Sequence, residues 1–254
     1  MSLLIGILLF AALGGIASAI FAVVFLWVRE ERSAVILPHF VSFATGALVG
    51  AALLALLPEA IAGAGNAGAG QIGLSMVAGL ALFFIIEKVV LWWHAHGEQR
   101  AGPLHVSGAL VLVGDSVHNA LDGVLIAAAF LNNWSLGVLT TVAVAAHEVP
   151  HRVGDFAILV HAGYSRRRAL LLNLATGIAS VFGALIAYFA LRGALFLLPY
   201  ALAFAAAGFL YIALAGLVPD LHRRSTNPQA ALMQIGLVAA GVVMIAVAER
   251  LANI

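Results

Sequence analysis

Apolar residues fill this chain in eight long runs, and short polar or glycine-rich stretches separate the runs. A helix that spans a membrane needs about 20 predominantly apolar residues, and each run reaches about that length. The first run lacks a basic leader and a small-residue cleavage site, so we interpret it as a retained span. The pattern predicts an all-α membrane protein, a single domain over residues 1–254, with helices at 3–28, 34–57, 72–93, 104–130, 134–161, 168–191, 195–218 and 229–250.

Composition supports this reading. Hydrophobic residues make up 64% of the chain and charged residues 9%, whereas about a quarter of the residues in a typical soluble domain are charged. The formal net charge of +1 gives no reason to expect a nucleic-acid partner, so the expected environment is the lipid bilayer. The absence of cysteine excludes disulfides, thiolate metal ligands and a cysteine nucleophile.

Arginines in the short loops predict the orientation of the helices, because cytoplasmic loops carry an excess of Lys and Arg. The loops after the first, third, fifth and seventh runs are arginine-rich, whereas the opposite loops contain only Arg192. The arginine-rich face is therefore expected to be cytoplasmic, with both termini outside. We expect a multi-pass protein of the inner (plasma) membrane of a bacterium. The glycine-rich stretch at 63–70 is then an external, flexible loop without chemistry.

Two similar tripeptides indicate an internal repeat. Leu57-Pro58-Glu59 ends the second run on the outside, and Val218-Pro219-Asp220 ends the seventh run on the cytoplasmic side. Opposite orientation is expected of an inverted repeat that relates the first three helices to the last three and leaves the fourth and fifth in the centre. Coincidence is the alternative, since proline followed by a polar residue commonly ends a membrane helix.

The polar residues of the spans are concentrated in the fourth and fifth runs. Their spacing of three or four residues places each set along one stripe of a helix. Ionisable residues inside a bilayer are costly and mark functional sites, so the two stripes are expected to face each other or water. The stripes consist of Asp115, His118, Asn119 and Asp122 in the fourth run, and of His147, Glu148, His151, Arg152 and Asp155 in the fifth.

These residue types predict a metal site. Imidazole, carboxylate and amide ligands without sulfur suit zinc and neighbouring divalent ions. Pro150 is expected to kink the fifth helix and Gly123 to loosen the fourth, which would open a cavity between broken helices. We expect Asp115 and Asp155 to orient ligands or carry protons and Arg152 to be their counter-ion. The candidate metal ligands are His118, Asp122, His147 and His151, followed by Asn119 and Glu148.

A family resemblance supports this reading. The segment from His118 to Gly123 reads HNALDG and resembles the HNxxDG signature of ZIP (Zrt-, Irt-like) metal transporters, while His147 to Phe156 reads HEVPHRVGDF and resembles their HExPHExGDF. Residues 56–60, 83–88 and 208–213 are similar to the family's second, third and seventh helices. The resemblance therefore covers most of the chain in the right order.

The resemblance implies a 3+2+3 helix arrangement, often a homodimer, that moves Zn2+, with Fe2+, Mn2+ or Cd2+ as alternatives, toward the cytosol. It implies no enzyme activity and no organic cofactor. It suggests that helices 1, 4, 5 and 6 slide like an elevator against the rest. A primary site would map onto His118, Asp122, His147 and His151, and a second onto Asn119, Glu148, the shared His151 and a ligand from the sixth run, which offers Asn173, Thr176 and Ser180.

The chain departs from the family pattern at Arg152, where the closest subfamily has Glu. A fixed cation beside a binuclear centre would repel the second ion, so we expect one tightly bound metal. His94, His96 and His105 are candidates for a weak acceptor site for exiting metal, although short loops also contain His by chance.

Two alternatives use the same residues. An intramembrane zinc metalloprotease would use HExxH at 147–151 with Leu121-Asp122-Gly123 as its LDG segment. In such proteases HExxH precedes LDG, whereas here it follows, so the order argues against this reading. A selective channel needs weak binding so that ions leave quickly, and three histidines with a carboxylate are expected to bind too tightly.

Overall fold

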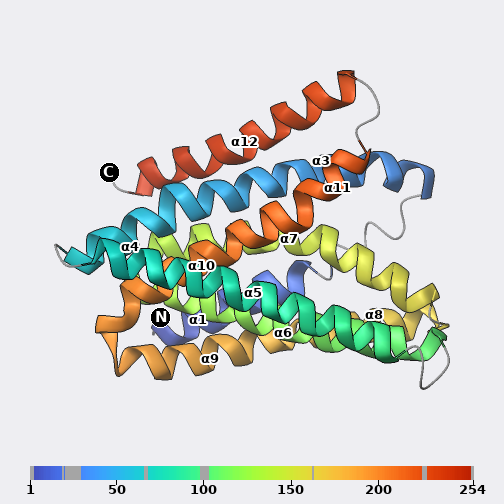
Figure 1. Cartoon of the computed structure of the whole chain (residues 1–254), viewed down its shortest axis with the longest axis horizontal. Coiled ribbons are helices and arrows are strands. Elements are labelled where there is room, and N and C mark those ends of the chain that lie inside the picture. Colours follow the sequence, from blue (N-terminus) through green and yellow to red (C-terminus); the bar gives the residue numbers. More distant parts are fainter. Residues whose placement is uncertain are drawn as a thin grey trace.

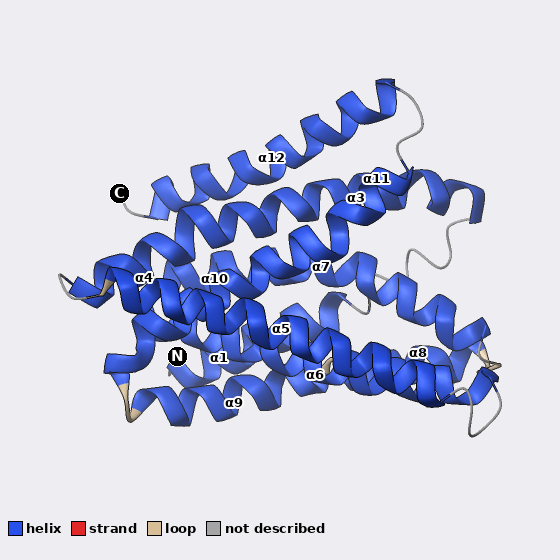
Figure 2. Cartoon of the chain, viewed as in Figure 1, coloured by secondary structure: helices blue, strands red, loops and turns tan. Residues whose placement is uncertain are grey.

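The computed structural model describes residues 3–18, 20, 30–65, 68–97, 103–161, 163–224 and 228–252. All regular structure in these ranges is helical, with no strand (Figure 2). The helices follow the eight predicted runs, although residues 19 and 21–28 of the first run lie outside the described ranges.

Several of the eight runs are divided into shorter helical pieces. The first comprises α1 (Leu3–Ala12) and the π turn η1 (Leu13–Ala17). The second comprises α3 (Glu30–Gly50), the π turn η2 (Ala51–Leu56) and α4 (Leu57–Ala64). Then follow α5 (Ala69–Gly97), α6 (Pro103–Asn132), α7 (Trp134–His161), α8 (Arg166–Thr176) with α9 (Ile178–Arg192), η4 (Leu195–Leu197) with α10 (Leu198–Tyr211), η5 (Ile212–Leu217) and α11 (Val218–Arg224), and α12 (Pro228–Ala252).

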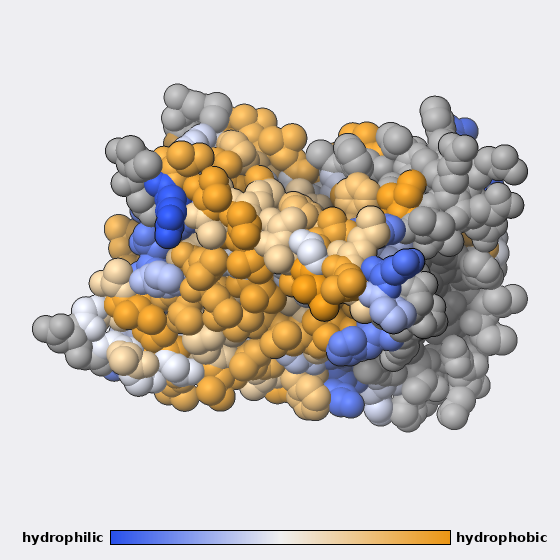
Figure 3. Space-filling model, turned by 90° about the horizontal axis from the view of Figure 1, so that it is seen from above, coloured by the Kyte–Doolittle hydropathy of each residue, from blue (hydrophilic) through white to orange (hydrophobic). Residues whose placement is uncertain are grey.

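Five helical stretches in the described residues are long and apolar enough to cross a membrane: Pro38–Ala64, Ala69–Val89, Arg166–Arg192, Leu195–Leu217 and Pro228–Leu251. The helices lie roughly along one axis (Figure 1). On the face seen in Figure 3, hydrophobic residues cover the middle and hydrophilic patches lie toward the ends. Helices α6 and α7 are not among the five, and they carry the polar stripes.

Helices α3 and α12 pack together, as do α5 and α10, while α6 packs against both α7 and α9. The contact of α6 with α9 is backbone to backbone. A side chain on Gly123 would overlap the Ser180 carbonyl oxygen, and one on Gly183 would overlap the Ala120 carbonyl oxygen. Small residues let membrane helices approach closely. Gly123 thus tightens the packing of the fourth helix, which corrects the expectation that it loosens this helix.

The helix irregularities lie elsewhere than expected. Helix α7 is continuous through residue 150 and α6 is continuous through Gly123, so the expected breaks in the central helices are wrong. The π turns η2 and η5 instead precede Pro58 and Pro219, each the second residue of the following helix. Proline lacks the N–H that would continue the helical hydrogen bonding, which is consistent with a wider turn before it.

The two ends of the glycine-rich stretch at 63–70, which was expected to be a flexible loop, are helical. Helix α4 continues to Ala64 and α5 begins at Ala69. Between them Gly65 has a φ of 63°, a left-handed conformation that glycine adopts without strain. The Gly68 N–H donates to the Gly65 carbonyl oxygen at 3.2 Å. Residues 63–64 and 69–70 of this stretch therefore belong to helices and not to the expected loop.

The glycine contact between α6 and α9 predicts a strong effect of a small substitution. We expect Gly183→Ala to lower the free energy of unfolding by about 1–3 kcal/mol, because the added methyl group overlaps backbone atoms of α6. The matched control is Gly73→Ala on α5, where nothing lies within 4 Å of the added methyl group. The midpoint of thermal unfolding in detergent compares the two variants. Equal midpoints would contradict the assignment of Gly183 to a backbone contact.

Candidate metal centre

The predicted polar stripes of α6 and α7 face each other. Four side chains from the two helices offer ligand atoms that all lie within 4.8 Å of one another: His118, Asp122, His147 and Glu148. We call these four residues the central cluster. Three are buried, and His118 is partly exposed.

The spacing of the ligand atoms fits one tetrahedral metal ion. A zinc ion with bonds of about 2.1 Å has ligand atoms about 3.4 Å apart. In the central cluster, Nε2 of His118 lies 3.1 Å from Nε2 of His147, and Nε2 of His147 lies 3.4 Å from Oδ2 of Asp122. Nε2 of His118 lies 3.8 Å from Oδ2 of Asp122 and 3.6 Å from Oε1 of Glu148. Small side-chain movements would bring all four atoms to an ion.

Two carboxylate oxygens of the central cluster lack hydrogen bonds. Oδ2 of Asp122 and Oε1 of Glu148 are buried and have no donor among the described residues. A buried acceptor without a partner is costly, and a bound cation would remove this cost. Nδ1 of His147 lies 3.2 Å from the Ala143 carbonyl oxygen. A proton on Nδ1 that is donated to this oxygen leaves Nε2 free to bind a metal.

Arg152 lies behind the central cluster with no exposed surface. Its Nε donates to Oε2 of Glu148 at 2.9 Å, and Nη1 donates to Oδ2 of Asp115 at 3.1 Å. Arg152 was expected to be the counter-ion of Asp115 and Asp155. The structure pairs it with Asp115 and with Glu148, whereas Asp155 pairs with His151. The guanidinium also donates to the side chains of Asn119, Asn173 and Thr176 and to the Gly15 carbonyl oxygen. It thereby joins helices α6, α7 and α8 and the π turn η1.

Asn119 is occupied by this polar network. Its Nδ2 donates to Oδ1 of Asp115 at 2.8 Å and its Oδ1 accepts from Nη2 of Arg152 at 2.6 Å. In this conformation the structure therefore does not bring Asn119 into the central cluster. Of the sixth helix, Asn173 and Thr176 contact Arg152, whereas Ser180 donates to the Ala11 carbonyl oxygen.

His151 lies beside the central cluster and not within it. Its ring stacks on that of His118, with centroids 5.1 Å apart, and its Nδ1 lies 3.0 Å from Oδ2 of Asp155 and 3.7 Å from Oδ1 of Asp115. Glu148 takes the fourth position that the sequence reasoning gave first to His151. The side chains of His94, His96 and His105 lie outside the described residues.

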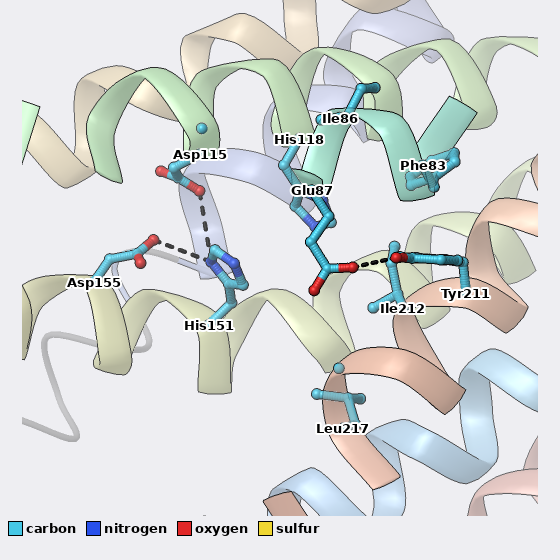
Figure 4. Close-up of a pocket in the computed structure, with 12 residues that line it drawn as sticks. Phe83, Ile86, Glu87, Asp115, His118, His151, Asp155, Tyr211, Ile212 and Leu217 are labelled. Carbon is cyan, nitrogen blue, oxygen red and sulfur yellow. Dashed lines mark hydrogen bonds and ion pairs between the residues drawn. The ribbon is translucent and has the colours of Figure 1, made fainter. Parts of the chain in front are cut away.

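A cavity of about 320 Å³ leads to these groups. Figure 4 shows Asp115, His118, His151 and Asp155 on one side and residues of α5 and α10 on the other. Across the cavity the Tyr211 hydroxyl donates to Oε2 of Glu87. Sequence reasoning gave these two residues no role at the site, although Glu87, beside Lys88, is one of two charged residues in the apolar third run and could have marked it.

Comparison with known proteins identifies a family and several relatives of this chain. The family model for ZIP zinc transporters matches residues 94–249. Zinc transporter ZIP13 of Pongo abelii is 38% identical over 228 residues, which cover 85% of this chain and 68% of that protein. The Homo sapiens ZIP13 is 34% identical over 85% of this chain and 71% of that protein. Zinc transporter SLC39A7 of Homo sapiens is 38% identical over 61% of this chain and 35% of that protein.

The relatives and the apolar helices show a multi-pass membrane protein. These relatives come from vertebrates, so they do not support the expected bacterial inner membrane. The family model covers more than half of the chain, and the ZIP13 proteins match over more than two thirds of their own length. The chain belongs to the ZIP zinc transporter family.

Proposed function

We propose that this protein carries Zn2+ across the membrane toward the cytosol, and that His118, Asp122, His147 and Glu148 bind the ion on the way. The observation that carries the proposal is the central cluster itself, with near-tetrahedral spacing and two buried carboxylate oxygens that lack donors. Iron, manganese and cadmium could be alternative substrates, because these ligands accept several divalent ions. His151 and Asn119 stay predicted ligands for another conformation.

As a member of this family the chain is a transporter and not an enzyme. The contacts of Glu148 agree with this. In an HExxH hydrolase the Glu is a free base beside a metal-bound water. Here Glu148 is fully buried and paired with Arg152 through Oε2, while Oε1 faces the two histidines. Its carboxylate is placed to bind a cation.

An elevator-like movement is our proposal for the mechanism. The cavity lies between α6 and α7 on one side and α5, α10 and η5 on the other, which is a boundary where two bodies could slide. Arg152 links helices of the proposed moving group, namely the first, fourth, fifth and sixth. The moving group would carry the ion past the rest of the bundle.

An inverted repeat with a 3+2+3 arrangement fits the helix pairs and irregularities. In such a repeat the second helix corresponds to the seventh and the third to the eighth. The packing of the second helix (α3) on the eighth (α12) should then be mirrored by packing of the seventh (α10) on the third (α5), and both contacts are present. The π turns before Pro58 and Pro219 correspond in the same way. The start of α1 and the end of α12 lie toward the same end of the bundle (Figure 1), which supports termini on one side. The homodimer rests on the family resemblance.

We further propose that one ion is bound at a time. Five side-chain oxygens surround the guanidinium of Arg152, and a second divalent ion would need this space. The fixed positive charge of Arg152 already balances these oxygens, and it would repel a second divalent ion.

Transport tests the central cluster. In liposomes loaded with a zinc-sensitive dye, we expect saturable uptake that falls about 100-fold or more in His118→Ala, because one of four ligands is lost. His222→Ala is the matched control, since His222 is exposed on α11 and outside the cluster. Normal uptake by His118→Ala would contradict the assignment of the site.

Metal content tests the role of Arg152. We expect one zinc ion per chain in the wild type and two in Arg152→Glu, because the new carboxylate replaces the fixed cation. Arg152→Gln is the control, since it removes the charge without adding an anionic ligand, and it should bind one ion. Elemental analysis after removal of free zinc gives the count. A single ion in all three proteins would remove the argument about Arg152.

Cysteine labelling tests the orientation, because the natural chain has no cysteine. We expect Leu217→Cys, which lines the cavity, to react with a membrane-impermeant thiol reagent only from the arginine-rich side. Phe182→Cys on α9 is the control. Its position is 62% exposed on an apolar helix, so we expect lipid to shield it from the reagent. Labelling of Leu217→Cys from the other side would reverse the proposed direction of the cavity.

A further inference from the structure

A second group of ionisable side chains lies at the cavity, beside the central cluster. Asp115 from α6 and His151 and Asp155 from α7 offer ligand atoms that all lie within 4.8 Å of one another. Figure 4 shows the three side chains facing one another. Two carboxylates and an imidazole form a ligand set that a divalent first-row ion accepts, with water in a fourth position.

Asp155 gives an independent indication of a ligand. The residue is 8% exposed, and its Oδ2 is buried and accepts no hydrogen bond from the described residues. This oxygen lies 3.0 Å from Nδ1 of His151, whose side chain is 42% exposed. A buried carboxylate oxygen thus lies in ion-pair distance of an imidazole that water can reach through the cavity. A cation held between them would satisfy both.

The group lies on one side of the central cluster along the helix axes. Helices α6 and α7 run in opposite directions (Figure 1). Asp115 precedes His118 by three residues on α6 and Asp155 follows His151 by four on α7, so both carboxylates are displaced toward the same end of the bundle. One helical turn corresponds to about 5–6 Å. This end carries the arginine-rich connections.

His118 adjoins both groups. It belongs to the central cluster, it lines the cavity, and its ring stacks on that of His151. Asp115 is shared with Arg152 and Asn119 through hydrogen bonds, which leaves it less able to donate charge to a metal. The second group, Asp115, His151 and Asp155, is therefore expected to bind a metal ion more weakly than the central cluster.

We propose that Asp115, His151 and Asp155 form a release site for zinc, which accepts the ion from the central cluster before it enters the cavity. This inference rests on the proposed transport function. Two divalent ions one helical turn apart repel each other strongly, so the two sites are occupied in turn and the chain holds one ion.

Zinc binding to the full-length protein in detergent tests the release site. Asp122→Asn with His147→Ala disables the central cluster, and we expect this double variant still to bind one zinc ion, about 10–100-fold more weakly than the wild type. Adding Asp155→Asn should abolish the binding, whereas adding His222→Ala should leave it unchanged. Zinc-soaked crystals of the double variant should show an anomalous peak about 2.0–2.2 Å from an oxygen of Asp155.

The outcomes separate this inference from the proposed function. A double variant that binds no zinc, or whose binding survives Asp155→Asn, overturns the release site even when the wild type transports zinc. A peak that contacts His151 but not Asp155 also overturns it. If the wild type transports no zinc but the variants bind zinc as expected, the proposed transport function is overturned, and Asp115, His151 and Asp155 are still supported as a zinc-binding site.

Discussion

The buried guanidinium of Arg152 is the interaction on which the rest of the site depends. Glu148 and Asp115 lie next to Asp122 and Asp155 inside a bundle of apolar helices, and anions there are costly unless a cation compensates them. Removal of one partner of a buried ion pair typically costs about 3–5 kcal/mol. Arg152 provides this compensation to Glu148 and Asp115 through direct ion pairs.

The fixed charge also determines what the metal encounters. Oε2 of Glu148 is paired with Arg152, whereas Oε1 has no donor in the described part of the chain and faces His118 and His147. Oδ2 of Asp122 has no donor either. In the proposed transport function, an arriving divalent ion would bind these two oriented acceptors, and Arg152 would fill the place of a second ion. Preorganised ligands of this kind favour binding because little has to be rearranged.

Sequence reasoning found the helices and the facing stripes, because apolar length and a spacing of three or four residues are local properties. It placed His151 in the central cluster and Asp115 and Asp155 behind it, whereas the structure groups these three together. That grouping depends on the relative rotation and height of α6 and α7. The tight α6–α9 contact at Gly123 likewise depends on a partner helix, so the same glycine was interpreted as a loosening element.

The location of the irregular turns has a functional consequence. The central helices α6 and α7 are continuous, so they hold their ligands at fixed spacing. The π turns lie in the first, second and seventh helices, and π turns occur frequently at functional sites. Gly15 in η1 contacts Gly177 between α8 and α9, and Arg152 donates to the carbonyl oxygen of Gly15. Movement at η1 would be coupled to the proposed metal site through Arg152, while the ligand geometry on α6 and α7 stays unchanged.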